Sequence, residues 1–144
     1  SGTGATSVGA IGAGTEIGAV SIGSDENGTI TLNGAITTTG AVNLDGPVSL
    51  ATGAITVDSS AGDAAINFLH TIDGAQNLTL SSGGGAVDIN GIIGSTTAIG
   101  TLTVNASGTG AIAIEQIGDG DPASGSLGAT IGNTGTTSVL YITA

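Results

Sequence analysis

The chain has 144 residues, 28 of which are glycine, and Phe68 and Tyr141 are its only aromatic residues, so it lacks the bulky side chains that fill an ordinary globular core. It contains no Lys or Arg and carries a net charge of −11, which makes nucleic acid and anionic membrane surfaces poor partners because both are bound through basic side chains. Cysteine is absent, and no apolar run approaches the roughly 18 residues of a membrane span, which argues against disulfides, thiol chemistry and membrane insertion.

Residues 1–17 are rich in Gly, Ala and Thr, and Val8, Ile11 and Ile17 are their only large apolar residues. We expect an irregular first coil here. The sequence starts at Ser1 with neither Met nor a signal-peptide pattern. This predicts a processed or excised part of a longer product.

A four-residue motif then recurs: Ala, a β-branched residue, a variable residue and a large apolar residue. Its copies start at residues 19, 41, 65, 86 and 111, so they are 22, 24, 21 and 25 residues apart. A period of about 20–25 residues with β-type composition predicts stacked strand coils. Successive side chains of a strand point to opposite faces, so ten residues are predicted to point inward and to stack in columns: Val20, Ile22, Val42, Leu44, Ile66, Phe68, Val87, Ile89, Ile112 and Ile114.

A second series places Thr between two residues that suit a strand, and a turn of small residues follows each copy. The copies are Ile36-Thr37-Thr38, Ile55-Thr56-Val57, Leu78-Thr79-Leu80 and Leu102-Thr103-Val104. Two series that agree on one period predict an all-β chain, a single parallel β-solenoid (β-helix) domain over 1–144 with about six coils of about 22–25 residues. Residues 134–144 are predicted to form a half-coil, in which Ser138-Val139-Leu140-Tyr141 repeats the first motif with Ser in place of Ala.

Three segments carry a family resemblance: Asp58-Ser59-Ser60-Ala61-Gly62, residues 71–80 (TIDGAQNLTL) and residues 94–104 (GSTTAIGTLTV). Together with the run from Gly46 to Thr134, they resemble the β-strand repeat regions of secreted bacterial surface proteins, the filamentous-haemagglutinin-like and autotransporter-type adhesins. The resemblance implies a right-handed parallel β-helix, export, and a structural or adhesive role at the cell surface. It implies no catalytic residue.

His70 is the single histidine and lies in a strand-like run between Leu69 and Thr71. We expect it to be an outward or corner side chain. The chain has no Gly-x-Ser-x-Gly elbow and no electrophilic Lys or Arg. The sequence therefore predicts a protein that is not an enzyme and that needs no cofactor.

Two acidic clusters are weak calcium candidates. Asp119 and Asp121 share one loop, and Asp25 and Glu26 form a second cluster. Calcium takes 6–8 oxygen ligands, and neither cluster supplies that number. We expect solvated turns at both places.

The leading functional hypothesis is a non-enzymatic extracellular structural protein, a solenoid subunit or repeat of a surface filament, sheath or stalk. One alternative is an adhesin segment that binds a glycan or a host or cell surface, although such sites usually need exposed aromatic residues. A second alternative is an ice-binding solenoid. We rank it last because its Thr pairs, Thr29/Thr31 and Thr101/Thr103, are not repeated on every coil.

The two ends predict self-assembly. The first 11 residues include Val8 and Ile11, and the last 11 include Val139 and Tyr141. Joined end to start, these two pieces have the 22 residues of one coil. Neither end shows the polar cap of a repeat protein or the Lys that often guards strand edges. We expect a head-to-tail homopolymer, made of separate subunits or of repeats in one polypeptide, with an excised fragment whose caps lie elsewhere as the alternative.

Overall fold

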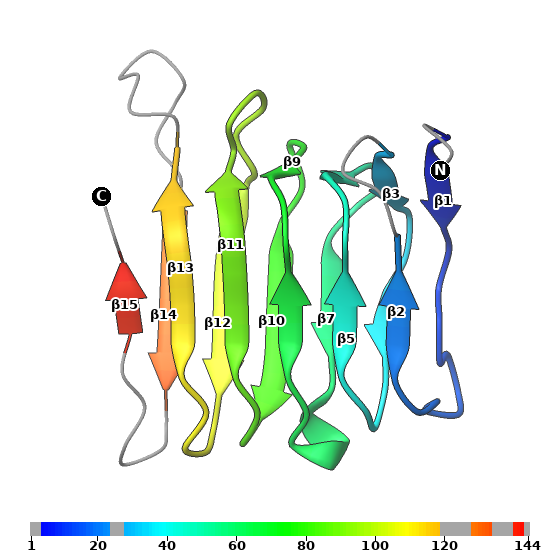
Figure 1. The fold of residues 1–144 in the computed structure, drawn as a ribbon, viewed down its shortest axis with the longest axis vertical. Coiled ribbons are helices and arrows are strands. Elements are labelled where there is room, and N and C mark those ends of the chain that lie inside the picture. The colour runs from blue at the N-terminus through cyan, green and yellow to red at the C-terminus, as the bar shows by residue number, and fades with distance from the viewer. Residues whose placement is uncertain (1–3, 24–27, 119–127, 134–139, 143–144) are drawn as a thin grey trace.

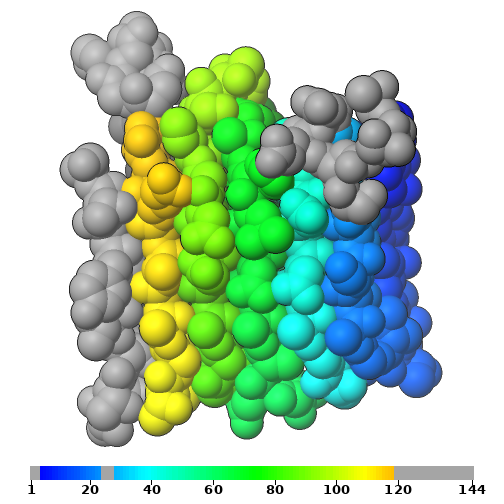
Figure 2. Space-filling view, in the orientation of Figure 1, coloured from blue at the N-terminus to red at the C-terminus, as the bar shows by residue number. Residues whose placement is uncertain are grey.

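The fold is a β-solenoid in which parallel strands stack in about five turns, where the sequence predicted about six. The computed structural model describes residues 4–23, 28–118, 128–133 and 140–142. The only helix among them is a 3-10 turn, η1 (Ser60–Gly62), and no helix in this part of the chain is long and apolar enough to cross a membrane. The turns follow one another in sequence order along the stack, as Figures 1 and 2 show.

Each turn passes through three faces. Face 1 contains β2 (Val20–Ile22), β5 (Val42–Leu44), β8 (Ile66–Phe68), the first parts of β11 (Val87–Ile93) and β13 (Ile112–Ile117), and β15 (Leu140–Ile142). Face 2 contains β1 (Thr6–Val8), β3 (Ile30–Leu32), β6 (Val48–Leu50), β9 (Ile72–Asp73), and the last parts of β11 and β13. Face 3 contains β4 (Ile36–Thr37), β7 (Ile55–Asp58), β10 (Leu78–Gly83), β12 (Thr101–Ala106) and β14 (Gly128–Asn133). In Figure 1, face 1 lies in front of face 3, and β1, β3 and β9 lie along the top.

The columns predicted for face 1 are confirmed. Val87 pairs in register with Ile66 on one side and Ile112 on the other, and Ile89 pairs with Phe68 and Ile114. Nine of the ten predicted residues are at most 7% exposed, and the tenth, Ile22 in the first turn, packs partly buried against the core. The alternation of large apolar and variable residues in the motif therefore correctly identifies which side chains of face 1 point into the core.

The series predicted for face 3 is confirmed except in its first copy. Leu78 pairs with Ile55 and with Leu102, as expected. Ile36, however, pairs with Val57 rather than with Ile55. Strand alternation repeats every two residues, so a shift of two leaves the inward and outward pattern unchanged and the pattern alone cannot detect it.

This shift gives the corner between faces 3 and 1 a column of buried hydroxyls. Thr38, Ser59 and Ser82 are each fully buried. Each donates a hydrogen bond to a backbone carbonyl of the corner that follows: Thr38 Oγ1 to Gly40 at 2.7 Å, Ser59 Oγ to Ala64 at 2.7 Å and Ser82 Oγ to Gly85 at 2.8 Å. A buried polar group is tolerated when it is hydrogen-bonded, so these hydroxyls hold the turn without leaving unpaired groups in the core.

Close approach of successive turns at this corner explains part of the glycine content. A Cβ on Gly85 would collide with the backbone of Ala64, and a Cβ on Gly110 would collide with the backbone of Gly85. Only glycine avoids such a collision, because it has no Cβ.

Face 2 is a third apolar ladder that the sequence analysis did not identify. Its main column pairs five residues in order: Ile30, Val48, Ile72, Ile93 and Ile117. Its strands are only two or three residues long where they are separate elements. A stretch this short shows too little alternation to be recognised.

The register predicted at the last strand is wrong. The repeated motif aligned Tyr141 with the large apolar position, which is Ile114 in the preceding copy. In the structure, Tyr141 pairs with Ala113, while Leu140 pairs with Ile112 and Ile142 with Ile114. A one-residue shift exchanges the two faces of a strand, and Leu140-Tyr141-Ile142 contains a second pair of large residues two positions apart that fits the same motif. Val139 lies outside the described residues.

Candidate functional sites

The first end of the solenoid presents open strand edges. Among the described residues, β1 pairs only with β3, and β2 pairs only with β5. Between them, Ile11 bridges Ile36 and Ile17 bridges Thr38, both on face 3. Within the described part of the chain, β1 on face 2 and β2 on face 1 therefore each have one unpaired strand edge, whereas face 3 ends in the two isolated bridges of Ile11 and Ile17.

The apolar columns are less covered at this end than inside. Val8 and Val20 are each 7% exposed, whereas the residues stacked on them, Leu32 and Val42, are 0% exposed. Ile17 is 41% exposed. The predicted assembly residues Val8 and Ile11 thus belong to an end whose core residues are covered on one side only, which makes this end a candidate assembly surface.

The opposite end has the same three-face arrangement. Its outermost strands in the described part of the chain are β15 on face 1, the end of β13 on face 2 and β14 on face 3. Tyr141, predicted as an assembly residue, lies in β15. Both ends of the described stack therefore offer segments for parallel pairing on all three faces, as strands at this end and as two strands and two isolated bridges at the first end.

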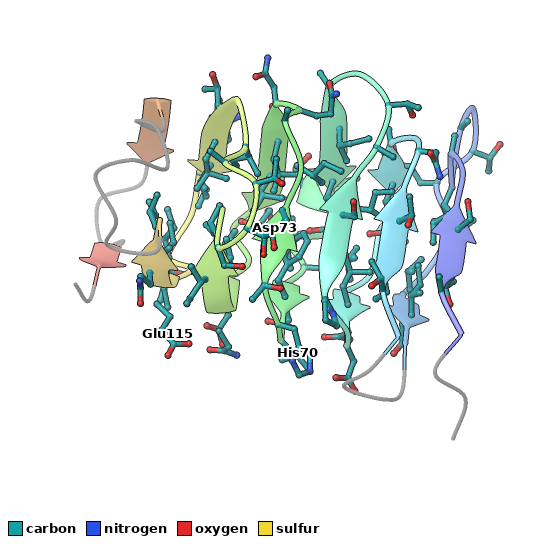
Figure 3. All side chains as sticks on the ribbon, turned by 90° about the horizontal axis from the view of Figure 1, so that it is seen from above. His70, Asp73 and Glu115 are labelled. Atoms are coloured by element: carbon teal, nitrogen blue, oxygen red, sulfur yellow. The ribbon has the colours of Figure 1, made fainter. Side chains whose placement is uncertain are left out.

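A shallow groove of about 250 Å³ is a second candidate site, at the corner between faces 1 and 2. Its lining comes from four turns: Pro47, Leu69, His70, Thr71, Asn90, Gly91, Ile92 and Glu115. Figure 3 shows His70 and Glu115 projecting from the same side of the molecule. The volume is below the roughly 300–1,000 Å³ of typical small-molecule pockets, so this groove suits a shallow surface contact better than an enclosed ligand.

His70 occupies the corner position that the sequence predicted. Its Nε2 lies 3.3 Å from Oδ1 of Asp45 on the preceding turn, and the two side chains are 28% and 39% exposed. Leu69 beside it is 40% exposed. Nucleophilic catalysis by Ser would need the hydroxyl within hydrogen-bond reach of the imidazole, and the lining of the groove contains no Ser.

Several carboxylates hold the loops, a role that the sequence analysis missed. Asp73 accepts hydrogen bonds from the backbone N–H groups of Thr96 at 2.7 Å and Thr97 at 2.9 Å, and from the hydroxyl of Ser95 at 3.1 Å. Asp63 accepts one from the backbone N–H of Gly84 at 2.6 Å. An Asp one turn before a Ser- or Gly-rich loop is the signal that could have revealed these contacts.

The calcium candidates Asp25, Glu26, Asp119 and Asp121 lie outside the described residues. Within the described residues, no three His, Asp or Glu side chains come together in a way that could hold a metal ion.

We expect a chelator to leave the melting temperature nearly unchanged, because no loop supplies the 6–8 oxygens that calcium takes. Thermal melts with and without EDTA would check this. A fall of more than about 10 °C, equivalent to several kcal/mol for a chain of this size, would show that one of the two acidic clusters binds calcium.

The Thr pairs that an ice-binding face would need lie on different faces. Thr31 is in β3 on face 2, whereas Thr101 and Thr103 are in β12 on face 3. On face 3, the strands β7, β10, β12 and β14 do carry one Thr each in register, namely Thr56, Thr79, Thr103 and Thr130, whereas Thr37 of β4 pairs with Asp58. The next outward position along these strands varies, with Asp58, Ser81 and Asn105 in register, so the face lacks a second Thr column.

In comparisons with protein-family models, curated proteins and solved structures, none matched this chain. Kinship with the bacterial surface adhesins therefore stays a hypothesis.

Proposed function

We propose that the chain is a non-enzymatic structural protein, a β-solenoid subunit or repeat of an extracellular surface filament, sheath or stalk that grows by head-to-tail stacking. The observation that carries the proposal is the open strand edge of β1 and of β2 at the first end, with the bridging residues Ile11 and Ile17 between them and apolar columns behind them. Unpaired edges of this kind are templates for pairing with another chain. The extracellular and bacterial setting is supported by the resemblance of the repeats to surface adhesins.

The geometry of such stacking favours a filament over a closed ring. A contact between the first end of one copy and the last end of the next is heterologous, because it joins two different surfaces. A heterologous contact that does not close produces an open fibre.

Sedimentation and negative-stain imaging of the purified protein test this proposal. At micromolar concentration and neutral pH, we expect elongated fibres that sediment and whose width matches one solenoid. A protein that stays monomeric at all concentrations tested, with frayed end turns in hydrogen exchange, would refute it.

The groove at the corner of faces 1 and 2 favours a second candidate function, an adhesin segment that binds a glycan or another surface ligand. It combines exposed Leu69 with polar His70, Asn90 and Glu115 along one side of the solenoid. The test is whether the monomer is retained on an immobilised polysaccharide. Retention that is lost in the Leu69→Asp variant but kept in the Thr56→Ser variant, which is changed on the far face, would favour this function over the filament.

A further inference from the structure

At each end of the solenoid, the exposed segments cover all three faces and so trace one complete turn. At the first end they are β2 on face 1, β1 on face 2 and the segment from Ile11 to Ile17 on face 3. At the other end of the described stack they are β15 on face 1, the end of β13 on face 2 and β14 on face 3. Both ends therefore display the same set of faces, in the same order and with parallel strands.

Three apolar columns run through the entire stack and reach both ends. On face 1 one column is Val20, Val42, Ile66, Val87, Ile112 and Leu140, and the other is Ile22, Leu44, Phe68, Ile89, Ile114 and Ile142. On face 3 the column is Ile11, Ile36, Val57, Leu80, Val104 and Ile131. The register between turns is thus constant from one end to the other and predicts where the next turn would fall.

We infer that the partner at the first end is a second copy of this chain, docked in the one register that continues these columns. The inference rests on the proposed head-to-tail stacking and names its contacts. Three core positions pair across the junction: Leu140 with Val20 of the next copy, Ile142 with Ile22, and Ile131 with Ile11. On face 2 the same register sets Ile117 beside Thr6, because Thr6 occupies the Ile30 column.

The order of the faces excludes the alternative in which two first ends meet. To bring two first ends together, one copy must be turned over, and this reverses the order of its three faces around the axis relative to the other copy. Only one face could then lie against the same face of the other copy, and the strands of the two copies would be antiparallel there. Head-to-tail docking matches all three faces at once and repeats the parallel pairing that every internal turn already uses.

Electrostatic repulsion between copies opposes the junction, but few charged residues lie in the segment that forms it. Each copy carries a net charge of −11, so copies repel one another. Glu16 is the single charged residue of residues 4–23. Raising the salt concentration to about 0.15 M shortens the Debye length to about 8 Å, and we therefore expect stacking to strengthen from low to physiological salt.

Engineered cysteines can test the register. Ser21, Asn43, Asn67, Asp88 and Ala113 form one outer column of face 1, and Tyr141 occupies the next register position after Ala113. Neighbours in this column can touch, since Asn67 Nδ2 lies 2.6 Å from Asn43 Oδ1. In the inferred junction, Tyr141 and Ser21 of the next copy are such neighbours, about 4.8 Å apart along the axis. That spacing lies within the Cα separation of a disulfide.

The double variant Ser21→Cys/Tyr141→Cys is expected to form a ladder of covalent trimers and longer multimers on mild oxidation, seen on a non-reducing gel. The chain has no cysteine of its own, so every cross-link comes from the introduced thiols. The matched control is Ser21→Cys/Ala113→Cys. Ala113 lies in the same column but one turn further in, about 9–10 Å from Ser21 of the next copy and beyond disulfide reach.

The variants should keep the wild-type circular dichroism spectrum, because this outer column already accommodates Ser, Asn, Asp and Ala. A ladder in the first variant and not in the control supports the inferred register. Fibres that form without cross-links overturn the register and leave the filament proposal standing. Monomers without cross-links overturn both, and covalent dimers of Ser21→Cys alone would show that first ends meet each other.

Discussion

Replacing Val87 with Asp is expected to lower the free energy of unfolding by about 3–5 kcal/mol, the typical cost of an uncompensated charge in a protein interior. Val87 is 0% exposed and lies between Ile66 and Ile112 in the face 1 column. The chain has no Lys or Arg, so no basic side chain can pair with the new carboxylate. Because each turn contacts only its neighbours, a damaged turn here also separates the turns before it from those after it.

The matched control is Asp88→Ala at the next position. Asp88 is partly exposed on the outer side of β11, and its oxygen accepts only a long hydrogen bond of 3.4 Å from Asn90 Nδ2. We expect a change within about 0.5 kcal/mol, as for most surface substitutions. Thermal or urea unfolding of both variants measures the difference, and equal losses would show that the assignment of inner and outer sides in β11 is wrong.

The predictability of each face follows from how much alternation its strands display. From β2 to β13, face 1 was predicted down to the residue because its motif has two large apolar positions, as in Val87 and Ile89, separated by a variable one. On face 3, Ile36 was misplaced by two residues, because side-chain alternation in a strand repeats every two residues and is unchanged by a shift of two. Thr38 was consequently taken for an ordinary strand residue, although its buried hydroxyl secures a corner.

The candidate sites depend on contacts between turns, which a single sequence does not show. Val8 and Ile11 were predicted as assembly residues because the 11-residue piece that holds them completes one coil with the last 11 residues and neither piece shows a polar cap. Their exposure relative to inner turns, however, depends on which strand stacks on which. The groove brings together His70, Asn90 and Glu115 from three turns. No spacing rule links these residues, because the separation in sequence between residues stacked on successive turns varies from 18 to 28.

Replacing Phe68 with Ala is expected to destabilise the chain by about 3–5 kcal/mol, the usual cost of removing a buried Phe side chain. Phe68 is 0% exposed and is the largest of the fully buried side chains. It lies between Leu44 and Ile89 in its column, near the middle of the stack. A solenoid core is narrow, and backbone pairing on all three faces fixes its walls, so neighbouring side chains cannot collapse into the cavity.

Leu69→Ala provides the comparison, because Leu69 follows Phe68 directly but is 40% exposed at the corner. It should cost less than about 1 kcal/mol. For a chain of this length, the Phe68 variant should melt about 10 °C lower than the Leu69 variant. The melting temperatures are measured by circular dichroism at low protein concentration, where stacking between copies does not contribute.

If the two variants had the same melting temperature, Phe68 would not fill the core at this turn, and the assignment of the column from Ile22 to Ile114 would be wrong. If only Phe68→Ala melted early and it also stopped forming fibres, assembly would depend on the integrity of inner turns as well as on the end strands. This outcome is expected when stability is a sum of nearest-neighbour contacts along a one-dimensional stack.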